Sequence, residues 1–426
     1  MKNLLILSFL SIFAISLFGQ VENSEREAPS SSPRFYLDAA EYKSEQPGKT
    51  RVDVFLQVPY SSVQFVKSNN GFAAKYSVTV SVFDEDKDNI IMEKMWNESV
   101  NAENFSTTDS KTNYNLSLKS FQLAPGDYLM RAEVYDKDSK KTYVLERPIN
   151  VKEIKGGEGL SSLILIQKTV KEDSLSKVIP NISQTVTTRD EGLPFFFEVY
   201  SDKAQEIDIE YQIKDAKNEK AIYNQTFTEQ VDSGRTMITQ KIEDLKFTIG
   251  QYKLVANVKD ESGGKIGKLE KSFYSKIFGF PRAIEDLEKA IEQMVYIATN
   301  SDIDFIEDGD TYEERLQRYI DYWKSKDPSP QTEENEVLSE YYRRVGYANE
   351  NFDSYYDGWR SDMGMIYITL GPPSYVERHP FDYNSKPYEV WDYYDINKRF
   401  VFVDRTGFGD YRLLDPVYGD WYRYRN

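Results

Sequence analysis

Cysteine is absent from this chain of 426 residues, and histidine occurs once, as His379. Without cysteine there is no disulfide, no cysteine nucleophile and no lipid-modified N-terminal cysteine. One histidine is too few for a zinc site rich in His or Cys. A Ser-His-Asp triad would have to use His379, but there is no Gly-x-Ser-x-Gly elbow. We therefore expect no cofactor and no metal site, and we expect His379 to be an exposed loop residue.

An excess of basic residues is also missing, because 70 acidic and 53 basic residues give a formal net charge of −17. Nucleic-acid binding and adhesion to anionic lipid both require clustered positive charge, so neither is expected. The acidity is expected to maintain solubility. With 40% hydrophobic and 14% aromatic residues, the chain has enough apolar side chains to build cores without disulfides.

Long hydrophobic runs are missing except near the N-terminus. Lys2 supplies a short positive region, Leu4–Phe18 is apolar, and small Gly19 follows. This run is shorter than the ~20 residues that span a bilayer, so it is typical of a cleaved secretory signal and not of a membrane anchor. We expect residues 1–20 to be a signal peptide and residues 21–33, rich in Ser, Glu and Pro, to be a flexible linker. The mature chain is then exported and has no transmembrane segment.

Short runs of alternating polar and apolar residues dominate the part of the chain that follows. Turn-forming clusters separate these runs, which predicts an antiparallel β-sandwich. The predicted strands are Arg51–Val58, Tyr76–Phe83, Tyr114–Leu118, Tyr128–Tyr135 and Thr142–Val151. The turn Asp84–Asn89 resembles the start of an EF-hand loop but lacks its glycine and its final glutamate, so we expect a β-turn there.

A second block of the chain repeats the first. Gly126–Asp136 and Gly250–Asp260 share the pattern G-x-Y-x-x-x-A-x-V-x-D without a gap. Two copies of this pattern predict two tandem immunoglobulin-like sandwiches. In such folds a tyrosine corner bonds its hydroxyl to backbone upstream of its strand, and Tyr128 and Tyr252 occupy that place in the pattern.

The apolar spacing becomes helical after Pro281, which is placed as the start of an amphipathic helix. A second helix has a capping box of Thr311 and Glu314, and Thr332 is expected to cap a third. Strand-like runs then return, with Asp404–Gly409 as the hairpin turn between the last two. The predicted strands are Met365–Leu370, Tyr388–Tyr394, Arg399–Val403 and Asp410–Leu414. About three helices and a small antiparallel sheet make an α+β domain.

The motifs at the C-terminal end resemble those of a known family. The segment GWRSDMGMIYITLGPP, followed by YEVWDYY and RFVFVDRTGFGDYRLL, is similar to the GWxTD domain. This family is named only for its motif and is found in exported proteins of Bacteroidetes and related bacteria. Gly358, Trp359 and Asp362 match the motif, whereas Ser361 stands at the threonine position and keeps the hydroxyl.

The resemblance covers residues 281–426 and includes the helical segment Tyr322–Phe352. It implies export to the periplasm or cell surface of a Gram-negative bacterium, but it supplies no established activity. The predicted domains are a first β-sandwich at residues 34–155, a second at residues 156–278 and the GWxTD-like α+β domain at residues 279–426.

The candidate site residues are motif positions with a structural or an interaction role. They are Gly358, Trp359, Ser361, Asp362, Gly371, Pro372, Pro373, Trp391, Asp404, Gly407, Gly409 and Asp410. Trp359 is expected to be buried between the third helix and the sheet. Asp362 is expected to accept hydrogen bonds from backbone amides of its own turn, and Asp404 and Asp410 are expected to shape the hairpin.

No catalytic residue is assigned. The sequence predicts an exported, non-catalytic interaction or scaffolding protein of the cell envelope, whose tandem β-sandwich spacers present the GWxTD domain to a protein partner. The alternative is a glycan-acting hydrolase with paired carboxylates, which would face one cleft about 5–10 Å apart. The carboxylates in question are Asp362, Asp392, Asp395, Asp404 and Asp410. Aromatic residues suited to recognition include Tyr383, Tyr418, Trp421, Tyr422 and Tyr424.

Overall fold

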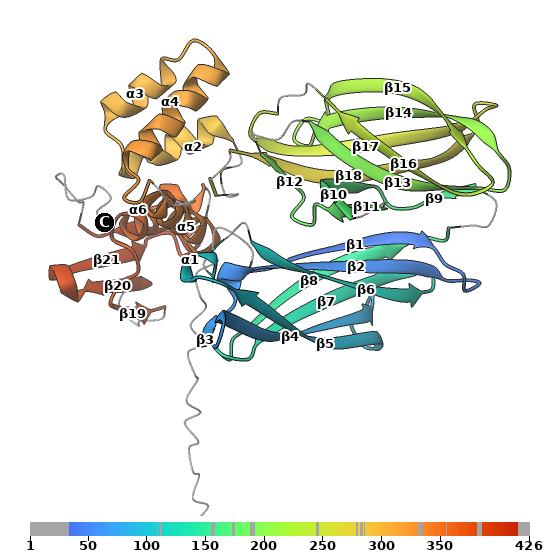
Figure 1. Ribbon diagram of the computed structural model, residues 1–426. Coiled ribbons are helices and arrows are strands. Elements are labelled where there is room, and N and C mark those ends of the chain that lie inside the picture. Colours follow the sequence, from blue (N-terminus) through green and yellow to red (C-terminus); the bar gives the residue numbers. More distant parts are fainter. Residues whose placement is uncertain are drawn as a thin grey trace, which may run out of the picture.

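The computed structural model of the chain is mostly β, with its larger helices gathered in the C-terminal part (Figure 1). It describes residues 34–415 except residues 109, 111–112, 155–157, 173–174, 188–191, 244–246, 278–279, 282–283, 285, 331–334, 355 and 381–385. The predicted signal peptide and linker lie outside the described residues, as do Tyr383 and the aromatic residues after residue 415. None of the described helices is long and apolar enough to span a membrane.

The first unit consists of two antiparallel sheets that enclose a core of buried residues. One sheet contains, in order, β1 (Tyr36–Lys43), β2 (Thr50–Pro59) and β6 (Tyr114–Leu123). The other contains β3 (Val66–Ser68), β4 (Gly71–Asp84), β7 (Gly126–Asp136) and β8 (Thr142–Val151), with β5 (Ile90–Ala102) also paired to β4. Alternate residues of β4, including Val78, Val80 and Val82, are fully buried, as the period of two requires. The connections include a short 3-10 helix, η1 (Tyr60–Ser62), and a single helical turn, α1 (Phe105–Thr108).

The second unit repeats this strand order. Its first sheet contains β10 (Ile164–Glu172), β13 (Leu193–Ser201) and β16 (Gly234–Ile242), with β9 (Glu158–Leu160) and β11 (Leu175–Pro180) added. Its second contains β15 (Ala221–Val231), β14 (Gln205–Asp215), β17 (Gly250–Asp260) and β18 (Lys265–Lys276), with β12 (Thr185–Thr187) parallel to β18. The order β1-β2-β6 thus corresponds to β10-β13-β16, and β5-β4-β7-β8 to β15-β14-β17-β18.

The two copies of the glycine–tyrosine pattern occupy equivalent strands. Tyr128 is the third residue of β7, and its hydroxyl donates to the carbonyl of Ala124 at 3.0 Å. Tyr252 is the third residue of β17, and its hydroxyl donates to the carbonyl of Thr248 at 3.2 Å. The prediction that the repeat places both tyrosines alike is confirmed, including the bond to backbone four residues upstream.

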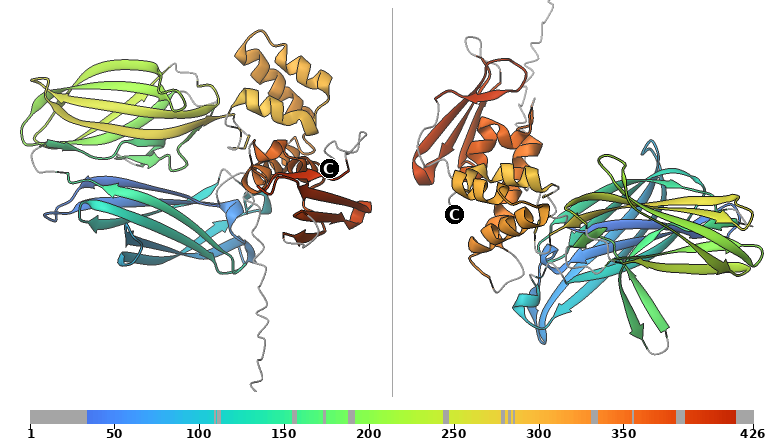
Figure 2. Two further views of the ribbon diagram at one scale, coloured as in Figure 1. Left: turned by 180° about the vertical axis from the view of Figure 1, so that it is seen from behind. Right: turned by 90° about the horizontal axis from the view of Figure 1, so that it is seen from above.

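The two units pack side by side, with β1 of the first lying against the second (Figures 1 and 2). Their ionic contact centres on Asp38, which is only 2% exposed. Asp38 accepts hydrogen bonds from Lys271 Nζ of the second unit at 2.5 Å and from Arg147 Nη1 of the first at 2.9 Å. A small apolar cluster that includes Phe55 and Ile164 adjoins this contact. Buried charge of both signs and apolar area therefore join the units.

The C-terminal part contains two layers, a helical layer and a sheet. The helical elements are α2 (Leu287–Gln293), η2 (Met294–Tyr296), α3 (Asn300–Glu307), α4 (Tyr312–Ser325), α5 (Glu336–Asn351), η3 (Gly358–Arg360) and α6 (Asp362–Leu370). The sheet runs in the order β19 (Tyr375–His379), β20 (Tyr388–Tyr393), β21 (Lys398–Asp404) and β22 (Tyr411–Leu413), with η4 (Tyr394–Ile396) between β20 and β21. One apolar cluster fills the helical layer, and a second lies between α6 and the sheet.

The predicted strand Met365–Leu370 is wrong, because these residues belong to helix α6. Ser361 caps the helix by accepting a hydrogen bond from the Gly364 amide at 2.9 Å, and Gly371, with φ of 82°, follows its end. Most residues of α6 are buried, so the helix is apolar on nearly all sides. A short apolar run without helical periodicity cannot be told from a buried strand by its pattern.

The helix ends also differ from the predicted ones. The first helix starts at Leu287 with Asp286 as its cap and not at Pro281. Helix α5 is capped by Asn335, whereas the predicted cap Thr332 lies outside the described residues. Helix α3 was not expected, although its capping box of Thr299 and Asp302 is present in the sequence. The predicted N-cap Thr311 of α4 is confirmed, but the reciprocal bond of the predicted capping box goes to Asp310 and not to Thr311. The Thr311 side chain accepts from the Glu314 amide, and the Glu314 carboxylate accepts from the amide of Asp310.

Candidate functional site

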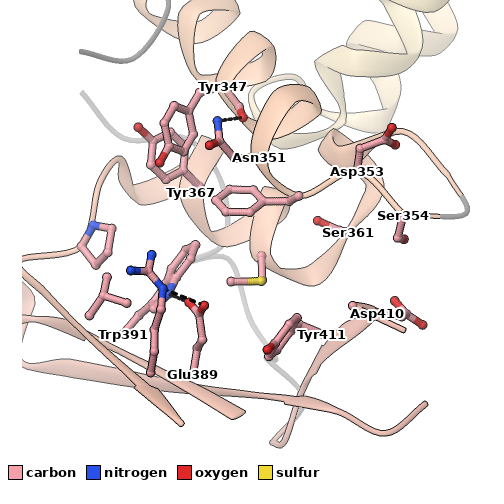
Figure 3. Close-up of a pocket in the computed structure, with 16 residues that line it drawn as sticks. Tyr347, Asn351, Asp353, Ser354, Ser361, Tyr367, Glu389, Trp391, Asp410 and Tyr411 are labelled. Atoms are coloured by element: carbon pink, nitrogen blue, oxygen red, sulfur yellow. Dashed lines mark hydrogen bonds and ion pairs between the residues drawn. The ribbon is translucent and has the colours of Figure 1, made fainter. Parts of the chain in front are cut away.

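A pocket of about 390 Å³ lies where α5 and α6 face the C-terminal sheet (Figure 3). Helix α5 contributes Tyr347 and Asn351, which are four residues apart and therefore share one face. Strand β20 contributes Glu389 and Trp391, which alternate onto the same side of the sheet. Tyr411 of the edge strand β22 adds a further wall. The pocket thus forms only when the helical layer and the sheet come together.

Aromatic rings make up much of the pocket lining. Tyr347 and Tyr367 stack with ring centroids 4.2 Å apart and planes 14° from parallel. Phe352 meets Tyr367 edge-on at 5.8 Å and lies 5.4 Å from Trp391. Such rings offer large, stiff surfaces whose faces carry partial negative charge. The wall is suited to apolar groups and to cations.

The charged residues of the pocket are held in different ways. The carboxylate of Glu389, whose side chain is 14% exposed, accepts from Arg378 Nε at 2.9 Å and from Trp391 Nε1 at 3.1 Å. Asp410 accepts from the hydroxyl of Tyr356 at 2.6 Å and pairs with an arginine, Arg412 Nε, at 3.0 Å.

Asp353 lines the pocket as an exposed residue just beyond the C-terminal end of α5. No ion pair to it occurs among the described residues.

The first residues of the GWxTD-like motif form the N-terminal end of helix α6 and the turn before it. The Ser361 hydroxyl donates to the carbonyl of Gly358 at 2.7 Å while it caps α6, a role that threonine can also fill. Gly358 lies against α5, because a Cβ on it would come within 2.0 Å of the Ala348 carbonyl oxygen. Any larger residue at position 358 would force η3 away from α5.

Trp359 is 4% exposed, so its predicted burial is confirmed. Its predicted place is only half right, because the indole lies in the helical core that includes residues of α5, whereas the C-terminal sheet belongs to a separate cluster. The amide of Trp359 donates to Asn349 Oδ1 at 3.0 Å, and its Nε1 donates to Asp357 Oδ2 at 3.2 Å. The hydroxyl of Tyr296 donates to the Trp359 carbonyl at 3.0 Å. Burial of this tyrosine raises its pKa to about 12.

Asp362 accepts a hydrogen bond from a backbone amide, as predicted, but from a different part of the chain. Its Oδ2 accepts from the amide of Leu413 in β22 at 2.8 Å, whereas the amides of its own turn were expected. Asp362 also lies in the first turn of α6, where a negative charge is favourable. The residue therefore ties the start of α6 to the edge of the sheet.

The remaining aspartates of this region also have structural partners. Asp404 accepts from the amides of Thr406, Gly407 and Gly409, so its predicted role in the hairpin is confirmed. Burial acts to raise the pKa of Asp404, but the hydrogen bonds from the two glycine amides outweigh it and hold the pKa below its usual value. The prediction for Asp410 is wrong, since its described partners are side chains and not hairpin amides.

Asp392 forms a two-pronged ion pair with Arg399, at 2.7 and 3.0 Å. The guanidinium holds the pKa of the Asp392 carboxyl below its usual value. Asp395 lies exposed on η4. No cluster of His, Cys, Asp and Glu able to hold a metal ion occurs in the part of the chain that the structure describes.

The structure brings five of the candidate residues to the pocket and leaves the others elsewhere. Those that line it are Ser361, Pro373, Trp391, Gly409 and Asp410. Gly358 and Trp359 belong to the helical layer, Gly371 and Pro372 follow α6, and Asp404 and Gly407 form the hairpin.

His379 is not a loop residue, since it ends β19, bonds to Glu377 at 2.9 Å and stacks on Tyr388 at 4.3 Å.

The sequence did not single out several residues that shape the pocket. These are Tyr347, Asp353, Tyr367, Arg378, Glu389 and Tyr411. Tyr347 and Asn351 recur at helical spacing on α5, and Glu389 alternates with Trp391, so each lies on a predictable face of its own element. Nothing local indicates that these faces meet.

Comparison with known families identifies the C-terminal region. Residues 250–411 match the family model of the GWxTD domain, in agreement with the resemblance of the C-terminal motifs. The match begins at β17, ahead of the region expected from the motifs. The second unit contacts the helical layer, because Ile249 and Ile277 pack into the helical core and the Ile249 amide donates to Tyr312 of α4 at 3.0 Å.

Similarity to other proteins is remote. A search of curated proteins gave no match. Among solved structures, a red sea bream transglutaminase is 9% identical, with 57% of this chain and 32% of that chain covered and a TM-score of 0.19. The fibronectin(III)-like modules of Clostridium thermocellum CbhA are 12% identical, with 57% of this chain and 94% of that chain covered and a TM-score of 0.16. The chain thus spans about a third of the transglutaminase.

Proposed function

We propose that this chain is an exported, non-catalytic interaction protein of the bacterial cell envelope, whose GWxTD domain binds a protein partner through the aromatic pocket. Two immunoglobulin-like sandwiches carry that domain. The apolar N-terminal run supports export. The resemblance of the C-terminal motifs to the GWxTD family supports the periplasm or cell surface of a Gram-negative bacterium.

The strand order supports the immunoglobulin-like assignment of the two sandwiches. Each unit has a three-stranded and a four-stranded antiparallel core sheet with the same connections. Each also has a tyrosine whose hydroxyl bonds to backbone upstream of its strand, as in a tyrosine corner.

The state of the carboxylates supports a non-catalytic role, and it is the observation that carries the proposal. Asp362 and Asp404 are bonded to backbone amides, and Asp392 and Glu389 are bonded to arginines. A glycosidase acid needs a carboxyl with a raised pKa, so that it holds a proton near neutral pH. The pKa values of Asp392 and Asp404 are lowered instead.

The lining of the pocket supports partner binding, because aromatic rings and polar groups face the same concave surface. Tyr and Trp bury a large area at a low entropic cost, which makes them frequent in recognition surfaces. Motif residues Ser361 and Trp391 are among those that line it. The proposed binding surface therefore includes residues of the family motif.

Photo-crosslinking in the native envelope tests this proposal. A benzophenone amino acid would replace Asn351, an exposed pocket residue, and in a matched protein it would replace Phe305, an exposed aromatic residue of α3. We expect one discrete crosslinked partner from position 351 and none from position 305. The additional change Tyr411→Ala should abolish that product because it removes a wall of the pocket.

Equal crosslinking from both positions, or insensitivity to Tyr411→Ala, would contradict the proposal. The hydrolase alternative has its own readout. If the purified protein released reducing ends from envelope glycan, and Glu389→Gln or Asp410→Asn stopped the release, the pocket would be an active site.

A further inference from the structure

We infer that the pocket accepts a lysine or arginine side chain of the partner protein. This inference deepens the proposed function and rests on it. It names the chemical group that the partner must present, and the argument uses the charge, the rings and the size of the pocket.

The charge of the pocket lining is negative. Its ionisable residues are three carboxylates, Asp353, Glu389 and Asp410, and one cation, Arg378, so the lining has a net formal charge of −2. The charge of Arg378 is offset by Glu389, which accepts from its Nε at 2.9 Å. A positively charged ligand is favoured over an anionic one.

The carboxylate without an ion pair among the described residues lies at one side of the pocket, because Asp410 is paired with Arg412 at 3.0 Å and Glu389 with Arg378 at 2.9 Å. Asp353 and Asp410 lie on that side in Figure 3, while Glu389 and Trp391 lie on the other. Asp353 has no ion pair among the described residues, so its charge is not neutralised there. The C-terminal end of α5 also reaches the pocket at Asn351, and the negative end of a helix dipole favours a nearby cation.

The rings favour the same ligand. A cation close to the face of a Trp, Tyr or Phe ring is attracted to the negative face of the ring. The pocket offers Tyr347, Phe352, Trp391 and Tyr411 together with the carboxylates. Its volume of about 390 Å³ lies at the lower end of the range for ligand pockets, roughly 300–1,000 Å³. This space is large enough for one long side chain.

Ligand titrations of the full-length protein by saturation-transfer NMR test the inference. The probes are Nα-acetyl-lysine methylamide, Nα-acetyl-arginine methylamide and the neutral analogue Nα-acetyl-norleucine methylamide. We expect the two cationic probes to bind, the neutral analogue to bind more weakly, and added salt to weaken the cationic probes. Asp353→Asn should lower the affinity for the lysine probe about two- to fivefold, the range of an exposed charge pair.

Arg378→Gln should have the opposite effect and raise the affinity for the lysine probe, because it frees Glu389 from its ion pair. Matched controls on α4 are Asp321→Asn and Lys324→Gln, which change the net charge in the same way away from the pocket. Neither control should alter binding. All four residues are on the surface, so circular dichroism should show an unchanged fold.

Three results would overturn the inference: equal binding of the norleucine analogue, reversed effects of Asp353→Asn and Arg378→Gln, or no binding of either cationic probe. Reversed effects would indicate an anionic ligand. If the probes fail while the crosslink from position 351 still depends on Tyr411, only the nature of the ligand is wrong. If that crosslink is also absent, the proposed function fails too.

Discussion

Asp362→Asn tests whether the GWxTD motif is a structural device. Asparagine keeps an oxygen that can accept from the Leu413 amide, which donates to Asp362 at 2.8 Å, but it removes the charge. A hydrogen bond to a charged acceptor is about twice as strong as a neutral one, so the loss is about 1 kcal/mol. Losing the negative charge from the first turn of α6 adds about 0.3–1 kcal/mol. We expect the sheet edge to lose about 1–2 kcal/mol of local stability.

Trp359→Ala provides the comparison. The indole is almost wholly buried in the helical core, and its truncation should cost about 3–5 kcal/mol. The change also removes the bond from its Nε1 to Asp357. Within one motif, the tryptophan should therefore contribute more stability than the aspartate.

Native-state hydrogen exchange of the full chain is the suitable assay, because a protein of several units does not unfold in a single step. In Asp362→Asn, amides of β21 and β22 should exchange about 5–30-fold faster, which corresponds to one or two kcal/mol. Amides of α4 should keep their rates, and the surface change Asp321→Asn should alter neither segment.

Two outcomes would refute this reasoning. One is unchanged exchange in β22 together with loss of the partner crosslink in Asp362→Asn, which would make Asp362 a functional residue and not a structural one. The other is a larger loss of stability from Asp362→Asn than from Trp359→Ala.

Three further substitutions test other parts of the molecule. Tyr252→Phe should cost about 1–2 kcal/mol, because its hydroxyl bond is in a site only 3% exposed, and Tyr128→Phe should cost less because its ring is more exposed. Because folding lowers the pKa of Asp404, its carboxylate stabilises the hairpin above the usual pKa of about 4, and this stability is lost as the pH falls through the lowered value. Hydrogen exchange of the hairpin amides should therefore accelerate at acid pH in the wild type but not in Asp404→Asn. Asp38→Ala should cost about 3–5 kcal/mol by leaving Lys271 buried without its carboxylate, and adding Lys271→Met should restore part of this.

Each of these predictions has a contradicting result. Equal costs of the two tyrosine changes would argue against burial as the cause of the difference. An acid transition of the hairpin that persists in Asp404→Asn would assign it to another group. If Lys271→Met adds to the loss in Asp38→Ala, measured by urea unfolding, the two residues are not coupled.

Local patterns in the sequence were sufficient where an element depends mainly on its own residues. The tyrosine repeat placed β7 and β17 correctly, and the aspartate at the start of Asp404–Gly409 identified the hairpin. Strand β5 was missed because it is an edge strand with little burial and weak alternation, despite its 13 residues. Helix α6 was mistaken for a strand because packing on several sides removed its polar face.

The pocket could not be predicted from the sequence. Its lining extends from Tyr347 to Tyr411, and its shape depends on how α5, α6 and the sheet pack. The partner of Asp362 was unpredictable for the same reason, since Leu413 is distant in the chain. Motif recognition located the region, but tertiary contacts decide what each motif residue does.

The ionic contact at Asp38 has a mechanical consequence. If the two sandwiches lay end to end, they would form a flexible connection as long as both sandwiches together. Here the chain folds back, and β1 lies against the second sandwich (Figure 1). The pair is therefore shorter than two sandwiches placed end to end, and both sandwiches have one end toward the C-terminal part (Figure 1). Tension along the chain must first shear Lys271 away from Asp38 before the connection between the sandwiches extends.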